Sequence, residues 1–213
     1  MAYFPMFVDI EKKKCLIVGG GAVALRKVQV LLDFGADVMV VAPQILPKIR
    51  EYPVSVYQRN FEKADLQGCE LVVAATDDAG LNHEISEAAR KHKIPVNAVD
   101  QQEDCSFIFP SYVKAQELVG AFSSGGNSPV MTQYLKKYMA RILTAELGEA
   151  NAYLGSIRAT VKEKLDEEAM RKEVYQEVLQ ELLMKIENNQ EVKLTEQQLE
   201  NVIGNRKKEE RGL

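Results

Sequence analysis

The chain has 213 residues, which is enough for one ordinary domain with an appendage and too few for three independent domains. Hydrophobic residues make up 46% and charged residues 27%, and 13 Gly with 7 Pro are too few for a fibrous or disordered chain. With 27 Lys and Arg against 31 Asp and Glu, the net charge is -4, so no global basic surface predicts binding to nucleic acid or to an anionic membrane.

The cysteines and the first residues indicate the compartment. Cys15, Cys69 and Cys105 are odd in number and widely spaced, which favours reduced thiols over a disulfide framework. The chain has only two histidines, His83 and His92, and no C-x-x-C pair, so no resident metal site is predicted. The first positive charges follow the apolar residues, the reverse of a signal peptide, and no apolar run approaches the roughly 18 residues that span a bilayer. We therefore expect a cytoplasmic protein.

Short apolar runs alternate with amphipathic segments over the first hundred residues. Strands that are apolar on both faces and separated by helices indicate a parallel sheet covered on both sides. With right-handed crossovers, the sequence predicts an α/β, doubly wound, Rossmann-like fold. The predicted strands are residues 15–18, 38–41, 54–57, 71–75 and 96–99, with helices at 23–34 and 81–92.

A glycine-rich turn follows the first predicted strand. Residues 19–24, GGGAVA, have the pattern G-x-G-x-x-A between a strand and a helix. Glycine allows a sharp turn and lets a pyrophosphate approach the backbone, while the helix N-terminus attracts the phosphates. We predict a dinucleotide site with Gly19 and Gly21 at the turn. The alternative is a glycine-rich turn without a ligand.

The acidic residue that usually binds an adenosine ribose is missing from the end of the second strand. That strand ends in Ala42-Pro43-Gln44, and Asp37 lies at its start, which is the wrong end. Gln44 is a candidate replacement. The sequence therefore leaves the choice between NAD and NADP open.

Two later strands also end in polar residues. Thr76 follows the fourth strand and is expected to reach the cofactor. For Asp77 and Asp78, a role as helix caps is at least as good an explanation as a contact with the cofactor. Asp100 follows the fifth strand, where a carboxylate is placed for proton transfer. The alternative for Asp100 is a solvated loop carboxylate beside Glu103 and Asp104.

The alternation stops near residue 100. Residues 106–113 and 118–123 predict strands joined by a polar turn, followed by the loop SSGGNSP and a helix from 129 to about 147. Ser128 is a natural N-cap with Pro129 at the first helical position. The loop residues Ser123, Ser124, Gly125, Gly126, Asn127 and Ser128 offer small side chains and free N–H groups that suit an anion, although the local sequence alone slightly favours a simple strand-to-helix turn.

The last third of the chain is richer in charge. Apolar residues recur there at helical spacing, which predicts a helical module with narrow apolar faces. Thr195 and Gln198 form a capping-box pattern that predicts the start of a last short helix, and residues 207–213 are expected to be a frayed tail.

Taken together, these segments resemble one family. In order and spacing, YFPMFVDIEKKKCLIVGGGAVALRK, AATDD, NAVD, CSFIFPS and SSGGNSPV are similar to the precorrin-2 dehydrogenase module of siroheme biosynthesis, which occurs alone or fused at the N-terminus of siroheme synthase. The resemblance covers residues 3 to 145 strongly. It implies a dinucleotide-binding Rossmann domain at 1–112, an α+β segment at 113–147 that builds a homodimer, and a helical C-terminal domain at 148–213.

The resemblance also implies a function and roles for particular residues. The family oxidises precorrin-2 to sirohydrochlorin with NAD as hydride acceptor, and some members insert ferrous iron as well. Asp100 matches the aspartate implicated in catalysis, and Ser124 matches a serine that is phosphorylated in some siroheme synthases. The family's substrate carries many carboxylates, so residues 123–128 are the predicted substrate-binding loop. The positions that match the family's NAD contacts are Ala22, Val23, Pro43 and Gln44.

Two alternatives remain open from the sequence. A Rossmann module that senses NAD(H) needs the glycine turn but gives no reason for Asp100 or for the SSGGNSP loop. A chelatase without dehydrogenase activity needs Asp100 but not an intact glycine turn.

Overall fold

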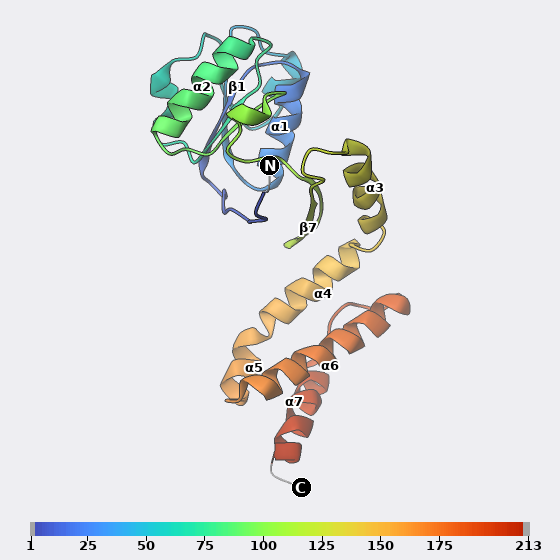
Figure 1. The fold of residues 1–213 in the computed structure, drawn as a ribbon. Coiled ribbons are helices and arrows are strands. Elements are labelled where there is room, and N and C mark those ends of the chain that lie inside the picture. Colours follow the sequence, from blue (N-terminus) through green and yellow to red (C-terminus); the bar gives the residue numbers. More distant parts are fainter. Residues whose placement is uncertain (1–2, 211–213) are drawn as a thin grey trace. The chain divides into compact units, whose positions relative to one another are not determined.

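The computed structural model describes residues 3–210 of the chain. Its contacts divide the chain into two compact units, Met1–Phe109 and Pro110–Leu213. Figure 1 shows the sheet and its covering helices in the first unit and mostly helices in the second. Among the described residues, no helix is long and apolar enough to cross a membrane.

The first unit is built on a parallel sheet in the order β3-β2-β1-β4-β5. Its strands pair in parallel throughout, which confirms the predicted doubly wound fold. The chain order reverses between β1 and β4, and doubly wound folds bind ligands at that point. The strands are β1 (Lys14–Val18), β2 (Asp37–Val41), β3 (Ser55–Tyr57), β4 (Leu71–Ala74) and β5 (Val96–Ala98).

Helices α1 (Ala22–Asp33) and α2 (Ala79–Lys91) cover opposite faces of this sheet. Alternate residues of β1 pack on the two sides: Cys15 and Ile17 lie in the core with α1, and Leu16 and Val18 lie in the core with α2. This period of two is the reason why the central strands are apolar at every position. Short 3-10 helices η1 (Pro47–Glu51), η2 (Lys63–Leu66) and η3 (Gln102–Asp104) lie in the connections.

The second unit begins with an antiparallel hairpin, β6 (Ser111–Ala115) and β7 (Leu118–Phe122). Helix α3 (Pro129–Met139) follows, and Ser128 caps it by accepting a hydrogen bond from the backbone N–H of Met131 at 3.2 Å, as predicted. The remaining helices are α4 (Ala145–Ser156), α5 (Arg158–Lys164), α6 (Glu168–Glu187) and α7 (Glu196–Glu210). Their apolar stripes pack into one buried cluster that includes Val161, Val174, Leu182 and Ile203.

Three predicted boundaries were wrong. The strand expected at 106–113 begins only at Ser111, because Phe107 and Phe109 pack against the core of the first unit before the hairpin starts. The helix expected over 129–147 ends at Met139, and a new helix begins at Ala145 after a turn with its own backbone hydrogen bonds. The tail expected from 207 is helical to Glu210, and the rest of it lies outside the described residues.

The predicted start of the last helix is confirmed. The side chain of Gln198 accepts a hydrogen bond from the Thr195 N–H at 2.9 Å, and the Gln198 N–H donates to the Thr195 hydroxyl at 3.3 Å. This reciprocal pair is a capping box.

Candidate functional site

A cleft of about 830 Å³ opens at the carboxyl ends of the parallel strands. The loops after β1, β2, β4 and β5 line it, and this is the edge where a doubly wound sheet offers a binding crevice. All the residues predicted to contact the cofactor line this cleft, together with the predicted proton acceptor. They are Gly19, Gly21, Ala22, Val23, Pro43, Gln44, Thr76 and Asp100.

The glycine turn needs its first two glycines for steric reasons. Gly19 has φ +128°, and a Cβ there would lie 2.2 Å from the carbonyl oxygen of Ala75. A Cβ on Gly20 would lie 2.0 Å from the carbonyl oxygen of Gln44. Gly21 differs, because a Cβ there would meet nothing within 4 Å. The turn is therefore pressed against the β2 and β4 loops at two residues and leaves space at the third.

The start of α1 faces this space. Gly21 is the N-cap residue, no side chain caps the helix, and the first turn contains no acidic residue. The first N–H groups of a helix have no intrahelical partner and attract anions. No Lys or Arg is among the residues that line the cleft. An anion bound here would therefore be held by backbone amides.

Asn60 and Phe61 also line the cleft, and the sequence reasoning missed both. They follow β3, a three-residue edge strand whose end carries no motif. Arg59 fixes this loop with two hydrogen bonds to the Asp65 carboxylate, at 2.8 and 2.5 Å. The same carboxylate accepts the Glu62 N–H at 2.9 Å.

The Asp65 contacts predict an acid-sensitive contribution to stability. The hydrogen bonds from Arg59 hold the pKa of the Asp65 carboxyl below its usual range. Such a group stabilises the fold above its unfolded pKa of about 3.9, and this contribution is lost as the pH falls through the lower folded pKa. Asp65→Asn should lower the free energy of unfolding near neutral pH, measured by urea denaturation. The difference from the wild type should narrow below about pH 4.

Exposed Glu51, for which the structure records no side-chain hydrogen bond, provides the control, and Glu51→Gln should change the free energy of unfolding little at any pH. If Asp65→Asn lowered the free energy of unfolding equally at neutral and acidic pH, the Asp65 carboxylate would not stabilise the loop through its charge.

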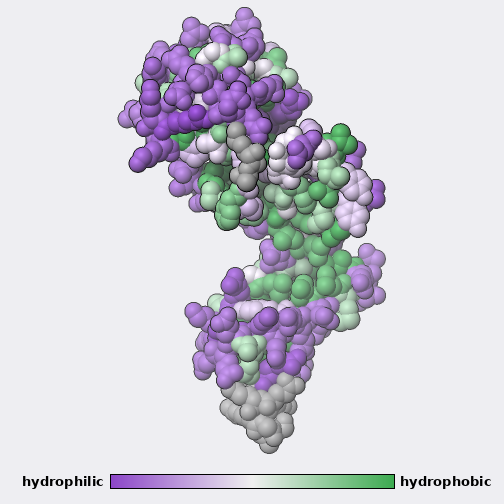
Figure 2. All heavy atoms as spheres, in the orientation of Figure 1, coloured by the Kyte–Doolittle hydropathy of each residue, from purple (hydrophilic) through white to green (hydrophobic). Residues whose placement is uncertain are grey.

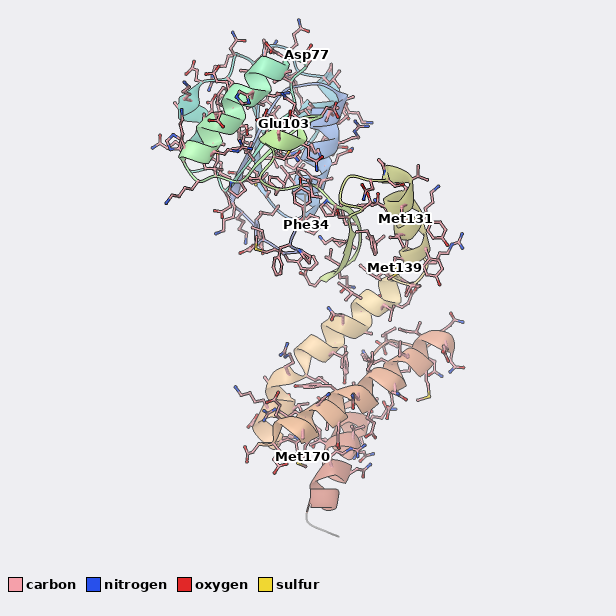
Figure 3. All side chains as sticks on the ribbon, viewed as in Figure 1. Phe34, Asp77, Glu103, Met131, Met139 and Met170 are labelled. Carbon is pink, nitrogen blue, oxygen red and sulfur yellow. The ribbon has the colours of Figure 1, made fainter. Side chains whose placement is uncertain are left out.

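The loop after β4 is held by its own side chains. The Thr76 hydroxyl donates to the Asn82 side-chain oxygen at 2.7 Å, and Asn82 is buried in α2. Asp78 caps α2 by accepting from the N–H groups of Gly80 and Leu81, at 2.8 and 3.1 Å. Of the two carboxylates considered as caps, Asp78 takes that role, and Asp77 lies on the cleft wall at the start of α2 (Figure 3).

Asp100 lies two residues beyond the end of β5, on the same wall as the glycine turn. It is exposed, and no side chain among the described residues hydrogen-bonds to its carboxylate. Its backbone is left-handed, with φ +60°, a conformation that few residues other than Gly, Asn and Asp adopt without cost. The carboxylate is thus available to a bound molecule.

Asp104, which the sequence places near Asp100 in the same loop, is buried and not solvated. Its side chain is only 5% exposed, and its Oδ1 lies 2.8 Å from Nδ1 of His83 on α2. A buried carboxylate needs such a partner, and no sequence motif links two residues that are so far apart. His83 is therefore a largely exposed residue of α2 with one specific polar contact to a buried carboxylate.

Lys27 of α1 does not line the cleft. Its Nζ lies 3.7 Å from the centre of the Phe109 ring, and burial lowers the pKa of its ammonium group to about 8.

The three cysteines are free, and burial raises the pKa of each thiol, to about 12 for Cys15. Among the described residues, no group of three or more His, Cys, Asp or Glu could hold a metal ion.

The SSGGNSP loop belongs to the second unit and connects β7 to α3. Two of its hydroxyl groups serve the loop itself: Ser123 accepts from the Gly125 N–H at 3.1 Å, and Ser124 accepts from the Ser128 N–H at 3.0 Å. Gly125 and Gly126 have φ +65° and +91°. These contacts explain the turn without a ligand, so substrate binding by residues 123–128 stays a prediction.

The chain is similar to known proteins in both of its units. Residues 6–111 match a family model described as "Putative NAD(P)-binding". A siroheme synthase of Nitrosospira multiformis is 40% identical over 188 residues, which is 84% of this chain and 40% of that protein. A siroheme synthase of Photorhabdus laumondii is 35% identical over 204 residues, which is 94% of this chain and 43% of that protein. The chain thus spans less than half the length of the siroheme synthases that it matches.

A solved structure supports the fold of both units. The structure titled "SirC, precorrin-2 dehydrogenase" matches 97% of this chain and 100% of its own, with a TM-score of 0.75 and 21% sequence identity. At that identity the match establishes the fold, including the hairpin and the helices after residue 110.

Proposed function

Because residues 6–111 belong to this NAD(P)-binding family and most of the chain is homologous to a part of siroheme synthase, we propose that the protein oxidises precorrin-2 to sirohydrochlorin with NAD. One observation carries the proposal: the glycine turn and Asp100 line the same cleft. The proposal is supported further by the match of 97% of the chain to the precorrin-2 dehydrogenase structure.

The cleft fits a dinucleotide. Gly19 and Gly20 bring the β1 turn against its neighbours, and Gly21 leaves room for a pyrophosphate at the first N–H groups of α1. Pro43, Gln44, Asn60 and Phe61 lie beyond the end of β2 and β3, where an adenosine would lie. With no carboxylate at the end of β2, Gln44 would be the ribose partner in NAD.

Oxidation of precorrin-2 removes two hydrogens, one as a hydride and one as a proton. When bound, NAD supplies the hydride acceptor. Asp100 accepts the proton, because its carboxylate reaches the cleft without a competing protein donor. Asp77 and Asp78 on the same wall add to the negative potential, which favours departure of a proton toward this side.

The proposal extends to ferrous iron as a second substrate. The ring nitrogens of sirohydrochlorin would hold the metal. Asp100 would receive the two displaced pyrrole protons one at a time and release each to water before taking the next, because its carboxylate is exposed. We also place the protein in the cytoplasm, where its three unpaired cysteines would stay reduced.

Absorption spectra test the proposed function. Protein with precorrin-2 should form sirohydrochlorin only when NAD is added, and ferrous iron should then convert it to siroheme. Binding of NAD without oxidation would favour an NAD(H) sensor. Iron insertion without oxidation would favour a chelatase. Either result would overturn the proposed dehydrogenase.

The proposed homodimer rests on α3. This helix has no buried residue within the chain, and Val130, Met131, Tyr134 and Tyr138 are each more than half exposed. Figure 2 shows apolar surface gathered over this helix and the α4 segment that follows it. Exposed apolar areas of this kind are typical of obligate interfaces.

Sedimentation should therefore find dimers at micromolar concentration and few folded monomers. Tyr134→Asp should shift the population toward monomer or unfolded chain, because a charge would be buried in the interface. Gln133→Asp adds the same charge to an exposed polar position of α3 and should leave the dimer intact. A stable wild-type monomer would contradict the proposed homodimer.

A further inference from the structure

The turn that presents Asp100 is held from both sides. Asp100 itself has a left-handed backbone, with φ +60°, and lies in the short connection between β5 and η3. Helix η3 (Gln102–Asp104) follows directly and leads back into the core through Cys105. The contacts of η3 therefore decide where the Asp100 carboxylate lies.

Three side chains of α2 bind η3. Nδ1 of His83 lies 2.8 Å from Asp104 Oδ1, and the Ser86 hydroxyl donates to the Asp104 carbonyl oxygen at 2.5 Å. Nη2 of Arg90 donates to the Glu103 carbonyl oxygen at 2.6 Å. The three side chains are three and four residues apart and so project from one face of the helix. Figure 3 shows Glu103 on this short helix, beside α2.

The other side of the turn is fixed by Cys105. Its sulfur lies 3.3 Å from the Ala98 N–H nitrogen, which donates to it, and 3.1 and 3.3 Å from the carbonyl oxygens of Ala98 and Gln101. The thiol thus ties the end of β5 to the residue after η3. Asp100 lies between these two sets of contacts.

His83 supplies the contact that is hardest to replace. The Asp104 side chain is 5% exposed, whereas the His83 side chain is 61% exposed. A buried carboxylate that loses its partner is costly, so the η3 turn must rearrange to bring it to water. The other two α2 contacts reach only backbone carbonyl oxygens.

We propose that His83 is a positioning residue for Asp100, acting through Asp104 and the η3 turn. The inference rests on the proposed function for its effect on turnover, whereas the effect on the turn itself does not depend on any substrate. His83→Ala should lower kcat by about 10- to 100-fold, the scale that a small misplacement of a reacting group causes. KM for NAD should change little, because the cofactor site lies on the glycine turn.

The variants separate positioning from general destabilisation. His83→Asn keeps an N–H donor near the place of Nδ1 and should restore most of the turnover. His92→Ala, at the exposed C-terminal end of the same helix, is the matched control and should behave like the wild type. In an Asp100→Asn background, His83→Ala should cause no further loss, because its effect passes through the carboxylate that is already missing.

Amide hydrogen exchange provides a readout that needs neither substrate nor turnover. The N–H groups of Asp104 and Cys105 donate to the carbonyl oxygens of Gln101 and Gln102, at 3.1 and 3.2 Å. In His83→Ala these two amides should exchange faster, while the strands of the sheet keep wild-type protection. The His92→Ala variant should show neither change.

The outcomes are separable. Unchanged exchange in His83→Ala, or a loss of turnover that is equally large in the Asp100→Asn background, would overturn the positioning role. A wild type that fails to oxidise precorrin-2 would refute the proposed function alone, and the exchange measurement would still decide whether His83 holds the turn.

Discussion

Replacing Asp100 by asparagine is expected to lower the rate of precorrin-2 oxidation by about 100-fold or more, the usual scale for loss of a general base. Asparagine keeps the size of the side chain and also tolerates the left-handed backbone, φ +60°, found at this position. The turn should therefore keep its shape while the proton acceptor is lost. Steady-state turnover of the variant with saturating NAD measures the effect.

The affinity for NAD serves as the control for Asp100→Asn. It should stay near the wild-type value, because the proposed contacts to the phosphates are backbone amides after β1. Iron insertion should fall together with oxidation, since the same carboxylate would accept the pyrrole protons. Loss of NAD binding as well would indicate a structural role for Asp100. Near-normal oxidation would refute its assignment and leave Asp77 or a water chain as the route of the proton.

The second large effect is expected at the glycine turn. Gly21→Asp should weaken NAD binding by about 100-fold or more, equivalent to about 3 kcal/mol, because a carboxylate would lie where the pyrophosphate must approach. The variant should fold, since φ at Gly21 is -87° and a Cβ there would meet nothing within 4 Å. Calorimetric titration of the folded protein with NAD measures the loss.

Two other glycines calibrate this experiment. Gly155→Asp adds the same charge at a second glycine whose Cβ would be in open space, in α4, and should leave NAD affinity unchanged. Gly20→Ala should instead reduce the yield of folded protein, because its Cβ would lie 2.0 Å from the Gln44 carbonyl oxygen. Unchanged NAD affinity in folded Gly21→Asp would remove this turn as the binding site.

Much of the first unit could be predicted because its signals are local. The apolar runs at β1, β2 and β4 and the glycines after β1 lie within a few residues of each other, and the parallel topology follows from their alternation with helices. The N-cap at Ser128 and the capping box at Thr195 are local for the same reason. Where the residues that determine a strand, turn or helix cap all lie within one short segment, the prediction from the sequence agrees with the structure.

The failures lie where no residue type marks the structure. The sequence has no Gly or Pro near Met139 that would end α3 there, and the turn that follows is held by local backbone hydrogen bonds that any residues can make. Phe107 and Phe109 have the composition of a strand but pack into the core of the first unit instead. The burial of Asp104 depends on His83, which lies on another element. Asn60 and Phe61 lie in a loop that the Arg59–Asp65 contact holds, and no motif at the end of β3 points to the cleft.

A single-turnover measurement with precorrin-2 and NAD, in which NADH and sirohydrochlorin are followed by their absorption in the same sample, tests whether hydride transfer to NAD is the oxidation step. The two products should appear together, in equal amounts and at the same rate, and both should be lost in folded Gly21→Asp. Sirohydrochlorin formed without matching NADH, or formed at the wild-type rate by Gly21→Asp, would contradict hydride transfer to NAD at this turn.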